Sequence, residues 1–178
     1  SCVFVDLEGG IWLTGSKGLL RAGNTTNPVS VIEGKPIKPG RFSKTKNGLF
    51  VLREKQVFKY SINSQETKVT DLIKITENEK LYVSEDNDMF IYDKAVEKID
   101  KNGNKEVIIK FEKPISTIFS KGDNLFISFK HSGLVYHNLK TNKTTDYRKN
   151  RLLSRNLPAG ATSFHLEGKK LWLGNDES

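Results

Sequence analysis

Short apolar segments, separated by turns rich in Gly, Asn and charged residues, recur along the whole chain. Five of them contain a triplet with an aromatic residue in the middle and an aliphatic residue on each side. The triplets are Ile11-Trp12-Leu13, Leu49-Phe50-Val51, Leu81-Tyr82-Val83, Leu125-Phe126-Ile127 and Leu171-Trp172-Leu173. Their central positions are spaced by 38, 32, 44 and 46 residues. A strand-rich unit of about 40 residues with one central aromatic is typical of a β-propeller blade.

Each unit shows the same order of short strands and tight turns. In the first unit the pattern predicts strands over Val3–Asp6, Ile11–Thr14, Leu19–Ala22 and Val29–Ile32. In the second unit Asn47-Gly48 is a strong signal for a two-residue hairpin turn, because both residues accept positive φ at low cost. No long stretch has the 3.6-residue period of a helix; Arg148–Asn156 is the single candidate for a helical turn.

The sequence therefore predicts an all-β chain, namely a β-propeller segment with about four complete four-stranded blades plus the start of a fifth. The expected repeats are approximately 1–41, 42–70, 71–114, 115–161 and 162–178. The five central aromatics, Trp12, Phe50, Tyr82, Phe126 and Trp172, are expected to fill the space between neighbouring blades. Because these repeats do not close a ring, we expect a segment of a longer propeller, whose end sheets expose apolar faces and tend to associate.

The third repeat leaves one ambiguity. Its pattern predicts strands over Leu72–Thr76, Leu81–Ser84 and Met89–Tyr92. The following segments Val96–Asp100 and Glu106–Phe111 flank an Asn-Gly turn. They either add a fifth strand or extend a hairpin.

Composition limits the class of protein. With 178 residues, of which 36% are hydrophobic, the chain can fill one well-packed domain. No apolar run approaches the roughly 18 residues of a membrane helix, so we expect no direct membrane contact from this segment. A single cysteine, Cys2, excludes an internal disulfide.

The net charge of +8 is unevenly distributed. Residues 118–163 carry +6 (8 basic minus 2 acidic), whereas residues 75–117 carry −3 (7 basic minus 10 acidic). Such a field can attract an anionic partner, or it is ordinary surface charge. No nucleic-acid motif or aromatic platform accompanies the basic residues, so nucleic acid is not expected as a partner.

The chemistry-bearing residues do not form a recognisable catalytic or metal motif. His131, His137 and His165 lie in different strands or turns and lack the spacing of metal ligands. The acidic run Glu85–Asp88 is expected to be a solvated hairpin turn rather than a cation loop, because it lacks the spacing and the glycine of a calcium hand. We expect no catalytic residue, no metal and no cofactor.

One basic cluster stands out, in the connector between the fourth and fifth units. It consists of Arg148, Lys149, Arg151 and Arg155. Connectors of this kind lie on one face of a propeller, where ligands bind, and arginine forks match carboxylates and sulfates. Together with His131, which lies in a turn, the cluster is the candidate contact for an acidic oligosaccharide. The alternative is a solvated loop, and the sequence leaves both open.

The repeat resembles a known family. Asp6–Gly15, followed by Gly18-Leu19, has the order Asp-x-x-Gly, Ile-Trp-Leu, short turn, Gly-Leu that is found in the two-component regulator propeller repeat family. Asn156-Leu157-Pro158 and then Leu171–Gly174 are similar to the start of a further repeat. Units two to four are degenerate, since Phe or Tyr replaces Trp there. The resemblance covers essentially the whole chain.

This resemblance implies a function. Such repeats form the periplasmic sensor region of hybrid two-component histidine kinases, which recognise oligosaccharides as dimers and signal to a kinase outside the sensor. It implies that this segment is a non-enzymatic, ligand-sensing part of the propeller, with an oligosaccharide, the remaining blades and a homodimer partner as its contacts. Two alternatives stay open: a propeller scaffold that binds protein, and a streptogramin-lyase-like propeller enzyme.

Overall fold

A computed structural model describes residues 2–5, 11–15, 18–22, 29–33, 42–61, 66–129, 133–149, 161, 163–168 and 170–174. The chain divides into two compact units, the first made of residues 1–83 and 99–105 and the second of residues 84–98 and 106–178. All regular structure in the described ranges is β-strand, apart from the single 3-10 turn η1 (Tyr147–Lys149). The all-β prediction is therefore confirmed. Within these ranges no helix has the length and apolar character needed to cross a bilayer.

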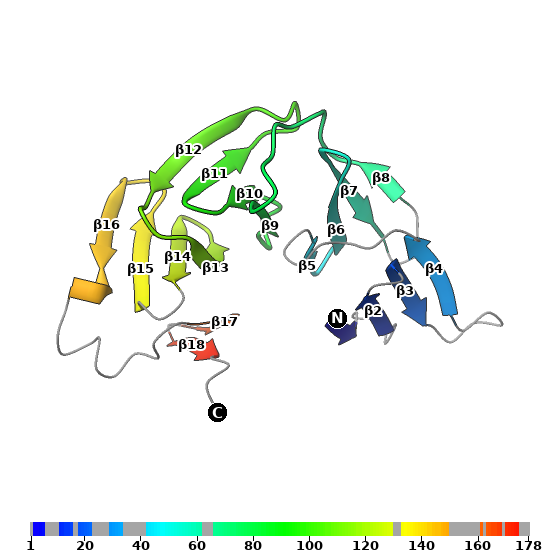
Figure 1. Cartoon of the computed structure of the whole chain (residues 1–178). Coiled ribbons are helices and arrows are strands. Elements are labelled where there is room, and N and C mark those ends of the chain that lie inside the picture. The colour runs from blue at the N-terminus through cyan, green and yellow to red at the C-terminus, as the bar shows by residue number, and fades with distance from the viewer. Residues whose placement is uncertain are drawn as a thin grey trace. The chain divides into compact units, whose positions relative to one another are not determined.

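Consecutive strands form consecutive sheets, and within each sheet every strand is hydrogen-bonded to the next one in the chain (Figure 1). Four sheets have four strands and the fifth has two. The first contains β1 (Cys2–Val5), β2 (Ile11–Gly15), β3 (Gly18–Ala22) and β4 (Val29–Glu33), and the second β5 (Phe42–Thr45), β6 (Gly48–Arg53), β7 (Gln56–Tyr60) and β8 (Glu66–Lys68). The third contains β9 (Lys80–Val83), β10 (Met89–Tyr92), β11 (Ala95–Ile99) and β12 (Lys105–Lys110). The fourth contains β13 (Ile115–Lys121), β14 (Asn124–Phe129), β15 (Gly133–Asn138) and β16 (Lys143–Asp146), and the fifth β17 (Ser163–Glu167) and β18 (Lys170–Gly174). Four-stranded sheets in sequence order are the predicted pattern; a propeller remains a prediction.

The second sheet shows why its strands form. β6 (Gly48–Arg53) is buried on both faces from Leu49 to Leu52, as expected for an inner strand covered on both sides. One face presents a cluster of Leu49, Val51, Phe58 and Tyr60, with Phe42 packed against it. The alternation of a strand places the neighbouring Phe50 on the opposite face.

The face that carries Phe50 packs on the next sheet. Ser43 lies directly opposite Phe50 and therefore shares its face. The Ser43 hydroxyl accepts a hydrogen bond from the Val83 N–H of β9 at 2.8 Å and donates one to the Val83 carbonyl at 3.3 Å. Phe50 itself is only 3% exposed. The central aromatic of the second sheet is thus on the side of the sheet that follows.

One predicted strand is wrong. Leu72–Thr76 is not a strand; it belongs to the extended connector between β8 and β9. Its backbone bonds to other segments, because the Asp71 N–H donates to Lys101 and the Ile73 N–H to Lys55. The Ile73 side chain is buried, whereas Leu72 is exposed. Ile73 therefore anchors this connector. The four strands of the third sheet are β9 to β12, so β11 and β12 form a hairpin within it and no fifth strand is added.

The Asn102-Gly103 turn of that hairpin requires its glycine. Gly103 has a φ of +81°, in the left-handed region that favours glycine. A Cβ atom there would lie 2.7 Å from Ile73 Cγ2 and 2.8 Å from the Leu72 carbonyl oxygen. The glycine therefore allows the connector to approach the turn closely.

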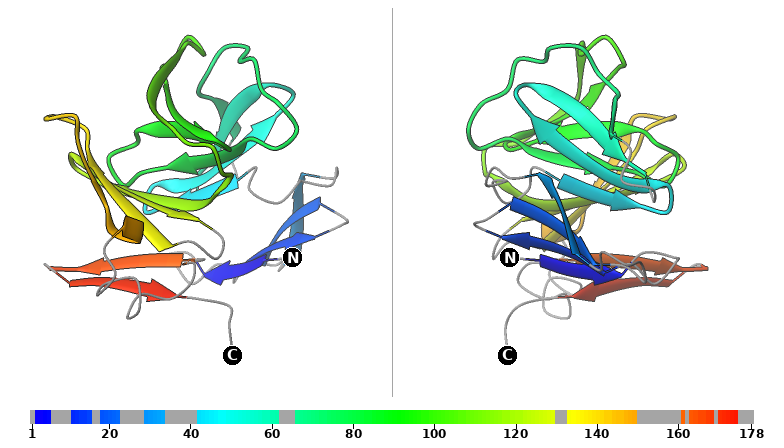
Figure 2. Two further views of the ribbon diagram at one scale, coloured as in Figure 1. Left: turned by 60° about the vertical axis from the view of Figure 1, so that its left-hand side comes forward. Right: turned by 90° about the vertical axis from the view of Figure 1, so that its right-hand side faces the viewer.

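The fourth and fifth sheets pack in the same sense as the second and third. Phe119, Phe126 and Tyr136 lie directly opposite one another on β13, β14 and β15, and so form an aromatic row on one face. On this face Phe119 stacks on Phe164 of β17, with 6.1 Å between ring centroids and 26° between ring planes. Figure 2 shows β17 and β18 (orange and red) beside the fourth sheet. The central aromatic, Phe126, again faces the sheet that follows, and it is half-buried.

The fifth sheet presents its central aromatic to solvent. Trp172 lies opposite His165, on the face away from the Phe164 and Leu173 pair. It is 56% exposed, and its indole N–H donates to Glu167 Oε2 at 3.2 Å. Of the central aromatics, Phe50 is therefore buried, Tyr82 and Phe126 are half-buried and Trp172 is exposed. The Trp12 side chain is not among those that the structure describes.

Candidate functional site

Arg148, the first residue of the predicted basic cluster, is held by a carboxylate two residues earlier. It lies in η1, directly after β16. Its Nε and one terminal nitrogen donate to the two Asp146 oxygens at 2.8 Å each, and its backbone N–H donates to Asp146 Oδ1 at 3.1 Å. A fork of this kind fixes the plane of the guanidinium as well as its position.

The same guanidinium packs on aromatic rings. Its central carbon lies 4.5 Å from the centroid of the Phe129 ring and 5.7 Å from that of Phe111. Phe111 and Phe129 meet edge to face, with centroids 4.8 Å apart and planes at 78°. Phe111 follows β12 and Phe129 ends β14, so Arg148 covers the place where these two segments meet.

In this arrangement each side chain favours the charged form of the other. The hydrogen bond from Arg148 lowers the pKa of Asp146, against the opposing effect of burial. The hydrogen bonds that Arg148 donates to the Asp146 carboxylate likewise raise the pKa of Arg148 above its ordinary value. Both side chains are half-buried. The geometry thus gives Arg148 a structural role at the end of the fourth sheet, and contact with a ligand stays a prediction.

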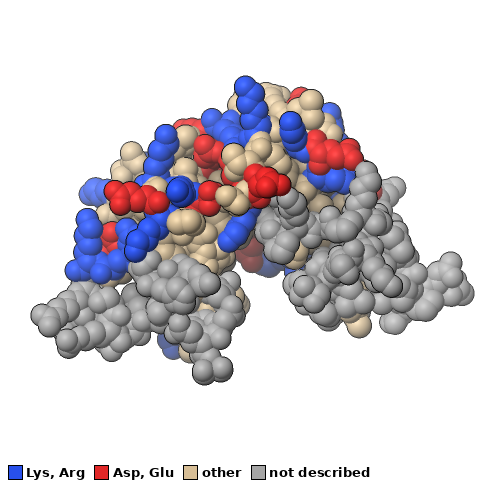
Figure 3. Space-filling view, in the orientation of Figure 1, with Lys and Arg blue, Asp and Glu red and all other residues tan. Residues whose placement is uncertain are grey.

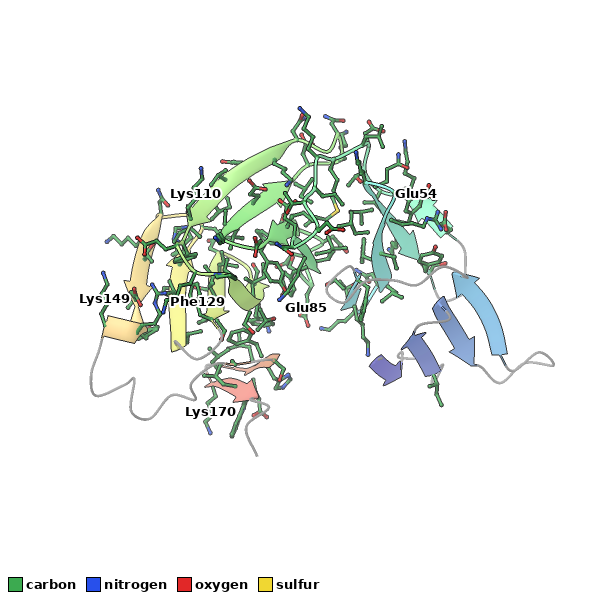
Figure 4. All side chains as sticks on the ribbon, viewed as in Figure 1. Glu54, Glu85, Lys110, Phe129, Lys149 and Lys170 are labelled. Atoms are coloured by element: carbon green, nitrogen blue, oxygen red, sulfur yellow. The ribbon has the colours of Figure 1, made fainter. Side chains whose placement is uncertain are left out.

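The rest of the predicted ligand site is only partly described. Lys149 is exposed; in Figure 4 it lies at the outer end of η1 and points away from Phe129. Arg151, Arg155 and His131 lie outside the described residues. Lys149 is therefore related to Arg148 by adjacency in the chain, and the cluster stays a predicted ligand site.

Sequence reasoning missed a second arginine cluster, on the second sheet. The Arg53 terminal nitrogens donate to the two Glu66 oxygens at 2.9 and 3.2 Å, and the Tyr60 hydroxyl donates to Glu66 Oε2 at 2.6 Å. These hydrogen bonds, the one from Tyr60 first, lower the pKa of Glu66. The Arg53 guanidinium also lies 4.2 Å above the Phe58 ring.

This cluster matches the one around Arg148, since each joins an arginine, a carboxylate and a phenylalanine near an outer strand. The sequence signal for both clusters is weak, because the phenylalanine that packs on each arginine comes from another element. Only the pairing of Arg148 with Asp146, two residues earlier, could be read from the sequence.

Of the histidines that the structure describes, His137 is buried and His165 is exposed. His137 is buried on β15, its Nδ1 lies 2.9 Å from the Thr144 hydroxyl, and burial lowers its pKa. His165 is exposed beside Trp172. Within the described part of the chain no three His, Cys, Asp or Glu side chains are grouped so that they could hold a metal ion.

The acidic run Glu85–Asp88 forms a turn between β9 and β10, as predicted. The Ser84 N–H donates to the Asp88 carbonyl at 2.9 Å, and Asn87 takes a φ of 65°. Asp86 accepts a hydrogen bond from the Gly122 N–H at 3.2 Å, and Asp88 pairs with Lys98 at 2.7 Å. These carboxylates therefore join neighbouring turns and strands.

The visible surface is mixed in charge. Figure 3 shows lysine and arginine side chains interspersed with aspartate and glutamate over the described residues of that view. Ion pairs such as Lys68–Asp71 at 2.9 Å fit this mixture. The view therefore shows no uniformly basic face.

Comparison with known proteins finds solved structures of similar fold. No protein-family model matches the sequence, and no curated protein does either. Among solved structures, a Bacteroides thetaiotaomicron protein of unknown function is similar with a TM-score of 0.57 at 12% identity, over 80% of this chain and 42% of its own. Virginiamycin B lyase from Staphylococcus aureus, in an inactive H270A form with quinupristin, is similar with a TM-score of 0.53 at 13% identity, over 81% of this chain and 53% of its own.

A third neighbour is an extracellular domain. The domain of BT4673 from B. thetaiotaomicron, described as a one component system, has a TM-score of 0.50 at 14% identity and covers 97% of this chain and 32% of its own. A second structure of that domain, described as part of a hybrid two component system, scores 0.49. The chain spans between about a third and about half of the length of these solved proteins. At these identities the likeness concerns the fold alone.

Proposed function

We propose that this chain is a ligand-sensing segment of a periplasmic β-propeller in a hybrid two-component sensor, and that it recognises an oligosaccharide. The signal passes to a kinase outside these residues, and the remaining blades and a homodimer partner complete the sensor. The observation that carries the proposal is the repeat itself: consecutive sheets pack through the face that bears a central aromatic, as seen at Phe50 and Phe126. Its similarity in fold to the extracellular domain of BT4673 supports the same assignment.

The ligand chemistry follows from the basic connector after the fourth sheet. Lys149 is exposed at its start, and Arg151 and Arg155 follow in the sequence. Arg148 is committed to Asp146 and Phe129, so it is the least available of the four for a ligand. We therefore assign the contact with an acidic oligosaccharide to Lys149, Arg151 and Arg155, with His131 as a further contact.

A glycan array on the intact protein, followed by calorimetry with the best ligand, tests the proposal. The triple variant Lys149→Ala/Arg151→Ala/Arg155→Ala is expected to bind an acidic oligosaccharide at least about tenfold more weakly. The matched control Lys110→Ala/Lys121→Ala/Lys143→Ala removes the same charge from exposed strand positions and is expected to change affinity less than about threefold. An array without any bound glycan refutes oligosaccharide sensing, and equal losses in both variants refute the assigned residues.

The second candidate is a propeller enzyme, favoured by the similarity in fold to virginiamycin B lyase. Incubating the intact protein with quinupristin and following the mass of the antibiotic separates the two. Turnover of the antibiotic replaces the sensor proposal with the enzyme. A protein-binding scaffold, the third reading, predicts neither glycan binding nor turnover.

A further inference from the structure

The outermost strand of the third sheet differs in composition from the other outer strands whose side chains the structure describes. β12 (Lys105–Lys110) is the end strand of its sheet and has six residues, with Val107, Ile108 and Ile109 at its centre. The end strands β8 and β16 have three and four residues and contain no valine, leucine or isoleucine. The fold therefore forms outer strands without such residues, and their presence in β12 needs another explanation.

The sheet itself does not bury the aliphatic residues of β12. No residue of this strand is buried and Val107 is 45% exposed, whereas all four residues of β10 in the same sheet are buried. Figure 1 shows β12 at the edge of its sheet, beside β11. An end strand presents N–H and carbonyl groups that its own sheet leaves unpaired, and apolar side chains along it make it a template for a further strand.

The sequence of this edge is complementary to itself in one antiparallel register. Glu106 and Lys110 are each two residues from Ile108, and the alternation of a strand places all three on one face. When two copies of β12 pair about Ile108, each Glu106 lies opposite Lys110 of the other copy. Val107 then lies opposite Ile109 on the other face. Opposite charges that face each other across two strands stabilise the pair, whereas like charges destabilise it.

Neighbouring registers lack this match of charges. A shift by one residue places Glu106 opposite Ile109 in one direction and opposite Phe111 in the other, so its carboxylate loses the lysine. Both charged side chains are exposed. Among the residues that the structure describes, neither Glu106 nor Lys110 takes part in an ion pair. Both charges are therefore available to a second strand, and they favour the register that is centred on Ile108.

From this self-complementarity we infer that two copies of the chain dimerise by antiparallel pairing of their β12 strands. The contact is isologous, because the same strand of each copy takes part, so it closes with two copies. The remaining blades of the proposed propeller stack on sheet faces, whereas this contact uses the outer edge of a sheet in the middle of the chain. The inference rests on the proposed function only in giving its homodimer partner a contact surface, and it is independent of the ligand.

Charge reversal tests the register. Sedimentation equilibrium of the full chain from about 1 to about 500 µM, the range of weak contacts, is expected to show a monomer–dimer equilibrium. Glu106→Lys and Lys110→Glu each place like charges opposite one another at both ends of the contact. Each variant alone is therefore expected to dimerise at least about tenfold more weakly.

Two combinations restore opposite charges. The double variant Glu106→Lys/Lys110→Glu is expected to dimerise within about threefold of the wild type, because each new lysine again faces a glutamate. An equimolar mixture of the two single variants is expected to form one-to-one heterodimers for the same reason. The control Glu112→Lys/Lys143→Glu reverses one acidic and one basic charge at exposed positions outside β12, and it is expected to leave dimerisation unchanged. Circular dichroism establishes that each variant is folded.

A disulfide tests the geometry of the contact. The background is Cys2→Ser, which removes the single native cysteine. In the inferred register the Ile108→Cys thiols of two copies lie directly opposite each other, with about 5 Å between Cβ atoms. Those of Val107→Cys are diagonal neighbours at about 7–8 Å, too far apart for a disulfide without backbone movement. In a glutathione redox buffer Ile108→Cys is expected to form linked dimers at least about tenfold faster, although Val107 is the more exposed residue.

Four outcomes overturn the inference. They are a monomer at every concentration, association that both single charge reversals leave unchanged, a folded double variant or mixture in which dimerisation is not restored, and equal rates of disulfide formation at the two cysteine positions. The second outcome would place association on another surface, such as the faces of the end sheets. The glycan array is read separately from these measurements, so the dimer contact and oligosaccharide sensing can each fail alone.

Discussion

The hydroxyl of Ser43 on β5 both accepts from the N–H and donates to the carbonyl of Val83 on β9, at 2.8 and 3.3 Å. Both residues are buried. One small side chain thus satisfies two polar backbone groups of the following sheet, at the face that also carries Phe50. The contact between these two sheets is therefore polar at one point and apolar around it.

Ser43→Ala is expected to lower the free energy of unfolding by about 1–3 kcal/mol, because the Val83 N–H and carbonyl lose a buried partner. Urea unfolding followed by circular dichroism measures the change. The matched control is Thr67→Ala, which removes a hydroxyl from the exposed strand β8 and is expected to cost less than about 0.5 kcal/mol. Equal costs at the two positions would contradict a specific role for the Ser43 bridge.

The sequence could predict the strands but not this bridge. The apolar triplets indicated inner strands because their residues are apolar on both faces, and Leu49 to Leu52 are buried on both faces. Ser43, a single polar residue on the edge strand β5, carries no such signal, since its partner Val83 is 40 residues away in the sequence. Which face of a sheet meets its neighbour is decided in three dimensions.

The segment Leu72–Thr76 and the basic residue Arg148 show why local sequence does not determine the role of a residue. Leu72–Thr76 has the apolar content of a strand, but Ile73 alone is buried as an anchor while the backbone bonds to Lys55. Arg148 has the charge of a ligand contact, but Asp146 and Phe129 occupy its guanidinium. In both cases local composition was read correctly, and the partner that determines the role comes from the fold.

Arg148→Lys is expected to be almost as destabilising as Arg148→Ala, each by about 1–2 kcal/mol, because an ammonium cannot reproduce the fork to Asp146 or stack on Phe129. Thermal unfolding of the two variants, together with Asp146→Asn and the corresponding double variants, gives the coupling. A coupling near zero between Arg148 and Asp146 would show that the 2.8 Å contacts contribute nothing.

Stability is expected to fall in acid in part through Asp146. Its pKa lies below the ordinary carboxyl value because of the hydrogen bond from Arg148. The charged form is therefore favoured in the folded state, and this contribution is complete above the unfolded pKa of about 3.9 and is lost as pH falls through the lower, folded pKa. Unfolding free energies between pH 7 and pH 2 measure it. Asp146→Asn is expected to flatten the acid limb, whereas Asp123→Asn, at an exposed turn, leaves it unchanged.

Phe50→Ala is expected to lower the free energy of unfolding by about 3–5 kcal/mol, since the ring is 3% exposed and its loss leaves a cavity between sheets. Trp172→Ala is expected to cost less than about 1 kcal/mol because the indole is 56% exposed. Chemical denaturation of both variants makes the comparison. A Trp172→Ala cost equal to that of Phe50→Ala would mean that another part of the protein covers this ring in the monomer.

Tyr92 should make the fold sensitive to alkali. Burial raises its pKa to about 12, and a hydrogen bond with Thr117 opposes this effect only partly. The neutral phenol is thus favoured in the folded state, whereas the unfolded chain ionises near pH 10. Its contribution is complete below pH 10 and declines as pH rises toward 12, by roughly 2–3 kcal/mol in total, because each pKa unit corresponds to about 1.4 kcal/mol.

The difference between the wild type and Tyr92→Phe isolates this residue, because the lysines and the other four of the five tyrosines are common to both. Tyr92→Phe is expected to lose the hydrogen bond to Thr117 at neutral pH and to show a shallower loss of stability above pH 10. Phenolate absorbance at 295 nm gives the second measurement, and the wild-type minus variant curve is expected to titrate near pH 12 or together with unfolding. A difference curve that titrates near pH 10 in the folded protein would show that the Tyr92 hydroxyl is in contact with water, and it would remove β10 from the core of its sheet.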